Sequence, residues 1–426
     1  MRLITALILV IIVNTVQAQK RDLEFYITRA KEFSPLIMQA QNENKIVGLD
    51  LELMKSILSK PEINTDASVL FAPIISHDNN AYKFEFVSNG ATNYAGYDMA
   101  LTDGGQYQAV VSLKQPLFTG SSFKTYSNKA DIARQQNENR ISLTSHELEK
   151  VISHQYILCL KAKESANISL ELLKEFDDRI LVMQKLVENA IFKVSDLMLM
   201  QIELDNYKLD YETYSADFRN NLSDLNALCG IRDTTKVDLQ ELNGQLNESN
   251  NTSSSFLKSY HLDSLNINAD QSISDLKYKP QVNLFANAGL NAVYVPAFNR
   301  FGLSTGLTFS WNIFDGYQQK IQKQKTGINL LTLDFEKQNF VTQQDIYKKS
   351  VLNQLDFLNQ KSQLIDNQIA KYDQLLKAYR SQLSQGDISV MDFKNTEKDF
   401  LSKKMERAML GLEKQALIIS FNYWNY

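Results

Sequence analysis

Proline and glycine are scarce in this chain of 426 residues, which contains only 6 Pro and 15 Gly. The ranges 117–279 and 297–426 contain no proline, and the 109 residues from 121 to 229 contain neither proline nor glycine. Because these two residue types are the main breakers of regular structure, the gaps predict very long helices. They argue against an ordinary α/β enzyme, which turns about every 10–20 residues.

The residue types that usually form metal and catalytic sites are also few. The chain has 4 His and 2 Cys, and the histidines are too scattered for a metal motif. It contains no HExxH, CxxC, Walker or GxSxG motif. The formal net charge is only −4, which gives no sign of nucleic-acid binding. We therefore expect no enzyme activity, no catalytic residues, no metal site, no cofactor and no nucleic-acid partner.

Long apolar runs are absent except at the N-terminus. Arg2 precedes the apolar run Leu3–Val13, and Val16-Gln17-Ala18 follows it. This order is typical of a secretory signal peptide over residues 1–18, cleaved after Ala18. A short membrane anchor is the alternative, but the apolar run is too short to span a bilayer well. We expect the mature chain to function beyond the cytoplasmic membrane.

Two landmarks recur in the sequence at one spacing. Phe118-Thr119-Gly120 and Phe314-Asp315-Gly316 are 196 residues apart, as are Val194–Leu197 and Val390–Phe393. A shared order of features at one offset predicts an internal duplication. The two copies would occupy residues 19–240 and 257–426, joined by a polar linker at 241–256.

The first copy contains an insertion. Pro61 and Pro280 start similar segments 219 residues apart, so the first copy carries 219 − 196 = 23 extra residues. They fall within 73–106, a region rich in Asn and Gly, which we expect to form an extracellular loop.

Each copy contains two strand-like stretches, at about 61–72 and 107–118 and at about 281–293 and 301–314. The clearest one alternates large apolar residues with small or polar residues from Phe301 to Ile313. The four stretches are about as long as tilted strands that cross a bilayer. A water-soluble sheet with one buried face is the alternative. The signal peptide and the bulky outer face favour a membrane barrel, and because four strands cannot close a barrel, several chains must contribute.

The remaining sequence predicts two helical hairpins, at 121–230 and 317–425. Mainly apolar residues recur at alternating intervals of four and three, as at Leu148, Ile152, Gln155 and Cys159, where Gln155 fills one position of the stripe. This is coiled-coil spacing. Helices of this length bury little apolar surface within one chain, so they also need neighbours. The predicted fold class is mainly α, with four membrane strands per chain.

Five segments together resemble the TolC family of outer-membrane efflux channels. They are Gln115–Gly120, Trp311–Gly316, Ser195–Gly230, Gly386–Phe393 and the region 22–60 with Ser34-Pro35. The first two are similar to the strand-to-helix junctions of the family, and Gly386–Phe393 is similar to its second periplasmic tip. The match extends over nearly the whole mature chain, in the family's order.

The resemblance implies a homotrimer in the outer membrane, with a β-barrel of twelve strands and a long α-helical barrel in the periplasm. Its partners would be outer-membrane lipid, a periplasmic adaptor (membrane fusion) protein and an inner-membrane pump. The implied function is a passive exit duct for small molecules in a tripartite efflux pump. Type I protein secretion with an ABC exporter is one alternative, and a soluble periplasmic coiled-coil scaffold is an alternative from another class.

The resemblance also implies a ring of aspartates at the closed pore entrance. Asp392 matches one of them by position, and Asn395 stands where the family has the next acid. Asp387 is a candidate to compensate, and Asp196 is the repeat mate of Asp392. Symmetric carboxylates on a pore axis attract cations. The competing interpretation of Asp392 and Asp196 is capping of the returning helix.

Three further residues are candidates for structural roles. Cys159 and Cys229 lie symmetrically about residue 194, so they would be at similar heights in a hairpin, and an oxidising compartment would permit a disulfide. Two small apolar packing residues are the alternative. Trp311, near the end of its strand, fits an aromatic girdle at the membrane interface.

Overall fold

The computed structural model describes residues 19–85, 93–95, 104–232, 237–247, 254–293 and 300–426. The predicted signal peptide and parts of the predicted loop and linker lie outside these residues. The chain divides into two compact units, one formed by 1–40, 139–258 and 337–426 and the other by 41–138 and 259–336. Each unit draws residues from both sequence copies, so the copies are not separate compact domains.

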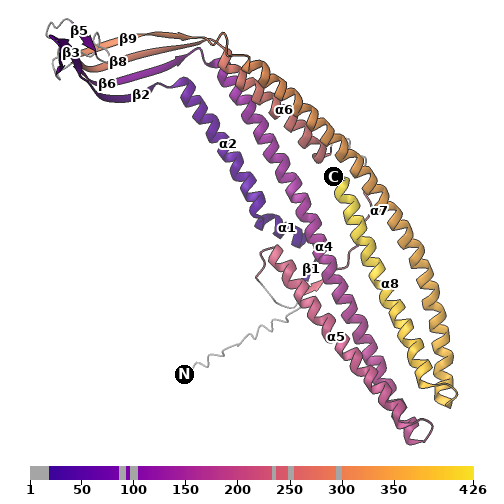
Figure 1. The fold of residues 1–426 in the computed structure, drawn as a ribbon. Helices are drawn as coiled ribbons and strands as arrows, with labels where there is room; N and C mark the ends of the chain where they lie inside the picture. Colours follow the sequence, from indigo (N-terminus) through magenta and orange to yellow (C-terminus); the bar gives the residue numbers. More distant parts are fainter. Residues whose placement is uncertain (1–18, 86–92, 96–103, 233–236, 248–253, 294–299) are drawn as a thin grey trace, which may run out of the picture. The chain divides into compact units, whose positions relative to one another are not determined.

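The second unit contains a four-stranded antiparallel sheet. Its strands are β2 (Glu62–Ala72), β6 (Gly104–Leu117), β8 (Gln281–Val293) and β9 (Phe301–Ser310). Their order is β2-β6-β8-β9, as Figure 1 shows, so β2 and β9 are the edges and the central pair joins the two sequence copies. The four strands predicted from alternation are therefore present and form one sheet.

The register of the sheet separates apolar from polar side chains. Ile63, Leu113, Ala286 and Thr305 form one row across the four strands. The next row, on the opposite face, consists of Asn64, Ser112, Asn287 and Ser304. Since side chains alternate between faces along a strand, one face is mainly apolar and the other is rich in amides and hydroxyls.

The predicted extracellular loop contains a second sheet, which the sequence analysis did not foresee. Its strands are β3 (Ile74–Asp78), β4 (Ala81–Glu85) and β5 (Asn93–Ala95), in the order β4-β3-β5. They are only three to five residues long, which is too short for alternation to reveal them.

The helices account for most of the remaining chain. Their bounds are α1 (Leu23–Phe33), α2 (Pro35–Ser59), α4 (Gly120–Glu188), α5 (Val194–Leu228), α6 (Ser255–Asp275), the 3₁₀ turn η1 (Leu276–Tyr278), α7 (Gln318–Gln385) and α8 (Val390–Trp424). Helix α4 has 69 residues and α7 has 68, as expected from the missing breakers. Among the helices of the described residues, none is both long and apolar enough to cross a membrane.

The first unit packs these helices as two hairpins. In Figure 1, α5 returns beside α4 and α8 returns beside α7. Near the N-terminal strand β1 (Gln19–Arg21), which pairs in parallel with β7 (Val237–Leu239), the core includes Tyr26 and Tyr156. A second core surrounds Phe176, Met183 and Met200 near the hairpin tips. Helix α5 ends in a Schellman motif, in which Ile231 N donates to Asn226 O at 2.8 Å and Gly230 adopts φ +64°.

Candidate functional site

The two hairpin tips carry the residues predicted for the pore entrance. Helices α7 and α8 are joined through Gly386, which adopts φ +78°, and Asp392 lies in the first turn of α8. Asp392, Asp387 and Asn395 are all exposed. The cap of α8 is Ser389, whose Oγ accepts from Met391 N at 3.1 Å. Capping therefore does not require Asp392, and its role at an entrance stays a prediction.

Asp196 has a different environment at the first tip. Its Oδ2 accepts a hydrogen bond from Lys193 N at 3.0 Å, just before α5 begins. A carboxylate at this position satisfies a free backbone donor and interacts favourably with the helix dipole. Asp196 therefore has the capping role that was the alternative to a pore role, whereas Asp392 does not.

Behind the tips, buried ion pairs connect the two hairpins. Arg179 on α4 pairs with Glu397 on α8, and Lys394 on α8 pairs with Glu203 on α5 at 3.0 Å. The side chains of Glu397 and Glu203 are only 3% and 5% exposed. Arg179 also contacts Glu175 at 3.0 Å, and burial together with nearby Arg380 lowers its pKa. Buried charges of this kind are retained only when they are paired.

The sequence analysis missed this cluster. In the sequence, these ion pairs are indicated only by charged residues that interrupt the apolar stripes. This indication is weak, because charged residues are usually exposed to solvent. The partners lie about 190–220 residues apart, so no local pattern reveals the pairing.

The two cysteines are buried and free in the structure. The disulfide that the sequence allowed is not formed there, although both residues belong to one core cluster. Cys229 caps the end of α5, and its thiol donates to Tyr26 O at 3.4 Å, which directs it toward α1. Burial raises the pKa of each thiol to about 12. This placement favours the alternative of two small apolar packing residues.

Exposed aromatic residues surround the junctions between strands and helices. Trp311 is 54% exposed and donates from Nε1 to Tyr278 O at 3.2 Å. Phe118 and Phe314, the repeat mates, are 87% and 72% exposed. Phe118 adopts φ +59°, a backbone conformation that is costly for a bulky residue.

Asp315 caps α7 by accepting from Gln318 N and Gln319 N, both at 3.0 Å, a role that the sequence analysis did not assign.

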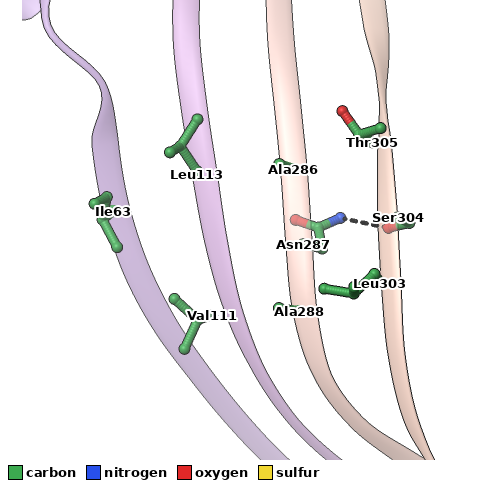
Figure 2. Close-up of a pocket in the computed structure, with 9 residues that line it drawn as sticks. All are labelled: Ile63, Val111, Leu113, Ala286, Asn287, Ala288, Leu303, Ser304 and Thr305. Atoms are coloured by element: carbon green, nitrogen blue, oxygen red, sulfur yellow. Dashed lines mark hydrogen bonds between the residues drawn. The ribbon is translucent and has the colours of Figure 1, made fainter.

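The apolar face of the sheet is exposed in the part of the chain that the structure describes. Val69, Leu303 and Phe309 are 74%, 79% and 67% exposed. Figure 2 shows Ala286 and Ala288 between larger side chains, where they leave a hollow of about 460 Å³. An apolar surface of this extent marks contact with another protein or with a membrane.

Among the residues that the structure describes, no group of three or more His, Cys, Asp or Glu side chains could hold a metal ion.

Comparison with known proteins assigns the fold. No protein-family model and no curated protein sequence matches the chain. Among solved structures, it is similar to the transmembrane channel CusC, with a TM-score of 0.72 and 13% identity over 96% of this chain and 92% of that chain. It is also similar to the outer membrane channel CmeC of Campylobacter jejuni, with a TM-score of 0.68 and 12% identity over 95% of this chain and 85% of that chain. For the outer membrane protein VceC of Vibrio cholerae, the TM-score is 0.69 and the identity is 12%, over 95% of this chain and 96% of that chain.

These likenesses confirm the fold expected from the resemblance to the TolC family. The chain has the fold of outer-membrane channels, with long helical hairpins and a four-stranded antiparallel sheet. At 11–13% identity, the similarity extends to the fold and not to individual site residues.

Proposed function

We propose that three copies of this chain form an exit duct in the outer membrane. The duct would passively conduct small molecules from the periplasm to the outside as part of a tripartite efflux pump. The observation that carries this proposal is the uncovered apolar face of the sheet opposite a face of amides and hydroxyls. Lipid would cover the apolar face, and the polar face would line an aqueous lumen.

The edges of the sheet support an oligomer. Strands β2 and β9 each have one unpaired side within the described chain. Unpaired backbone groups are not tolerated in lipid, and closed barrels begin at about eight strands. Pairing β9 of one copy with β2 of the next would close a ring, and three copies would supply twelve strands.

Helix α7 supports the same conclusion. Its buried side chains, including Val351, Leu355 and Leu358, pack within the chain. A second apolar stripe on α7 is exposed and consists of Ile321, Ile328, Phe335, Ile346, Phe357 and Leu364. A helix with two apolar stripes has neighbours on two sides, as in the wall of a helical barrel.

The location and partners follow from this assembly. Trp311 and the exposed aromatic residues at the junctions would lie at the periplasmic membrane interface. The helical hairpins would project into the periplasm and contact an adaptor protein that connects the duct to an inner-membrane pump. Protein secretion with an ABC exporter is the alternative use of the same duct. The coiled-coil scaffold is less well supported, because it leaves the apolar face of the sheet uncovered.

We also propose Asp392 as the entrance residue, with Asp387 and Asn395 beside it. An exposed acid that is not needed for capping is free to converge with its symmetry mates on the axis. Substitution of Asp392 by alanine should raise single-channel conductance and weaken block by trivalent cations. Unchanged conductance together with unchanged block would rule out the ring, and Asp196→Ala is the matched control at the capping site.

The function as a whole is tested by membrane fractionation, gel mobility and planar-bilayer recording. The full chain should fractionate with the outer membrane, run in SDS as a trimer that collapses on boiling, and form discrete channels. A soluble, monomeric chain without conductance would contradict the proposal.

A further inference from the structure

A partly enclosed cavity of about 200 Å³ lies between the two helical hairpins, close to their tips. Helices α4, α5, α7 and α8 all contribute to its wall. Six of its lining side chains are apolar: Val182, Met183, Leu186, Met200, Leu383 and Phe393. Three of these, Met183, Met200 and Phe393, are at most 2% exposed, so the floor of the cavity belongs to the packed core.

The other two lining residues are the arginines Arg179 and Arg380, and no carboxylate is among the described residues that line the cavity. Arg179 is already held by Glu397 and Glu175. Arg380 on α7 is exposed. The carboxylate of Asp373 on the same helix is bonded to Lys377 at 2.7 Å and interacts with Arg380 only through its charge. The cavity therefore combines an apolar interior with a guanidinium at its wall that can donate hydrogen bonds to an anion.

This combination defines a ligand class. A cavity of about 150 Å³ lined by apolar side chains is large enough to bind benzene. Thioether sulfurs make favourable contacts with aromatic rings, and guanidinium groups stack on rings and bind carboxylates in a bidentate manner. We propose that the cavity binds a small planar aromatic monoanion, with its ring over the floor formed by Met183, Met200 and Phe393 and its anionic group on Arg380.

Such a ligand would touch both hairpins at once. A molecule that binds one arrangement of packed elements shifts the population toward that arrangement. The bound anion would therefore hold α4 and α5 against α7 and α8 near the tips. Its effect on conductance rests on the proposed channel function, whereas the binding itself does not.

Binding can be tested on the full-length protein in detergent or nanodiscs with 4-fluorobenzoate as the probe, observed by ¹⁹F NMR. Saturable binding is expected, weakened about tenfold or more by Arg380→Gln because a charge-assisted hydrogen bond is lost. Lys371→Gln removes the same charge about two and a half turns away on α7 and should leave the affinity unchanged. The neutral isostere 4-fluorobenzamide should bind at least about tenfold more weakly.

A second variant tests the cavity itself. Leu383→Trp should fill the space and abolish binding while the helical circular dichroism is retained. Equal affinity of the wild type and Arg380→Gln, equal affinity for the acid and the amide, or absence of saturable binding would each overturn the proposal.

The bridging of the hairpins has its own measurement. Bound 4-fluorobenzoate should slow amide hydrogen exchange at the C-terminal ends of α4 and α7, and unchanged exchange there would overturn the bridging. Planar-bilayer recording keeps the two proposals apart, because a chain that binds the probe but forms no channel contradicts only the exit duct.

Discussion

At the scale of single residues, buried charge is the feature with the largest predicted cost. Glu397 keeps 3% of its side chain exposed and depends on Arg179, which keeps 18%. Removing one partner of a buried pair leaves an uncompensated charge and costs about 3–5 kcal/mol. Arg179→Ala leaves the buried carboxylate of Glu397 unpaired and should therefore lower the free energy of unfolding by this amount, measured as the loss of helical circular dichroism in denaturant.

The matched control for Glu397 is an exposed pair. Arg407 and Asp366 are 2.7 Å apart, with side chains 39% and 51% exposed. Solvent screening limits such pairs to about 0–1 kcal/mol, so Asp366→Ala should have little effect. Equal effects of the two substitutions would show that the pair of Glu397 is not buried in the assembled protein.

Thiol reactivity tests the cysteines. Burial raises the pKa of Cys159 and Cys229 from 9.0 to about 12, so almost no thiolate forms at pH 8. We expect slow alkylation by iodoacetamide in the native protein, faster alkylation as pH rises toward 12, and complete alkylation in denaturant. Failure to alkylate in denaturant without reductant would instead demonstrate the disulfide.

At the scale of elements, the two faces of β9 should respond in opposite ways to charge. Leu303 lies on the apolar face and is 79% exposed, whereas its neighbour Ser304 lies on the polar face and accepts from Asn287 Nδ2 at 3.4 Å. A lysine on a lipid-facing strand costs about 2–4 kcal/mol near the bilayer midplane.

Leu303→Lys should therefore reduce the amount of heat-modifiable trimer in outer-membrane fractions, and Ser304→Lys should not. If both variants assembled equally well, the apolar face would not face lipid.

Helices and strands also differ in how well the sequence predicts them. Strand β9 was predictable because its alternation extends over ten residues, and α4 because nothing interrupts it. The strands β3, β4 and β5 were not, because so few residues cannot establish a period of two. Helix caps were also not predicted from the sequence. The capping roles of Ser389 and Asp315 depend on the residue at which each helix begins, which periodicity does not specify.

At the scale of the whole molecule, the exposed stripe on α7 predicts how subunits associate. Its first members, Ile321, Ile328 and Phe335, are seven residues apart, and Ile346 and Phe357 follow at intervals of eleven. Intervals of seven and eleven deviate in opposite directions from the 3.6-residue period, so together they keep the stripe straight along the helix. A straight stripe suits long helices that run side by side in a barrel wall.

Phe335 is 70% exposed within one chain and should be buried between subunits. Phe335→Asp would place a carboxylate in an apolar interface. There the carboxylate loses its hydration and gains no partner. We expect loss of the SDS-resistant trimer with little change in the helical circular dichroism. Lys337→Asp, two residues along the same helix, is the control, and a stable Phe335→Asp trimer would contradict this interface.

The sequence by itself determined the types of element and the need for partners. Breaker-free spans specify long helices and alternation specifies strands, because both are local properties of the chain. Tertiary structure alone decided which elements meet: β6 beside β8, Arg179 with Glu397, and two free cysteines in one core. These contacts join residues 70 to more than 200 positions apart, so they depend on packing in three dimensions, which no local period encodes.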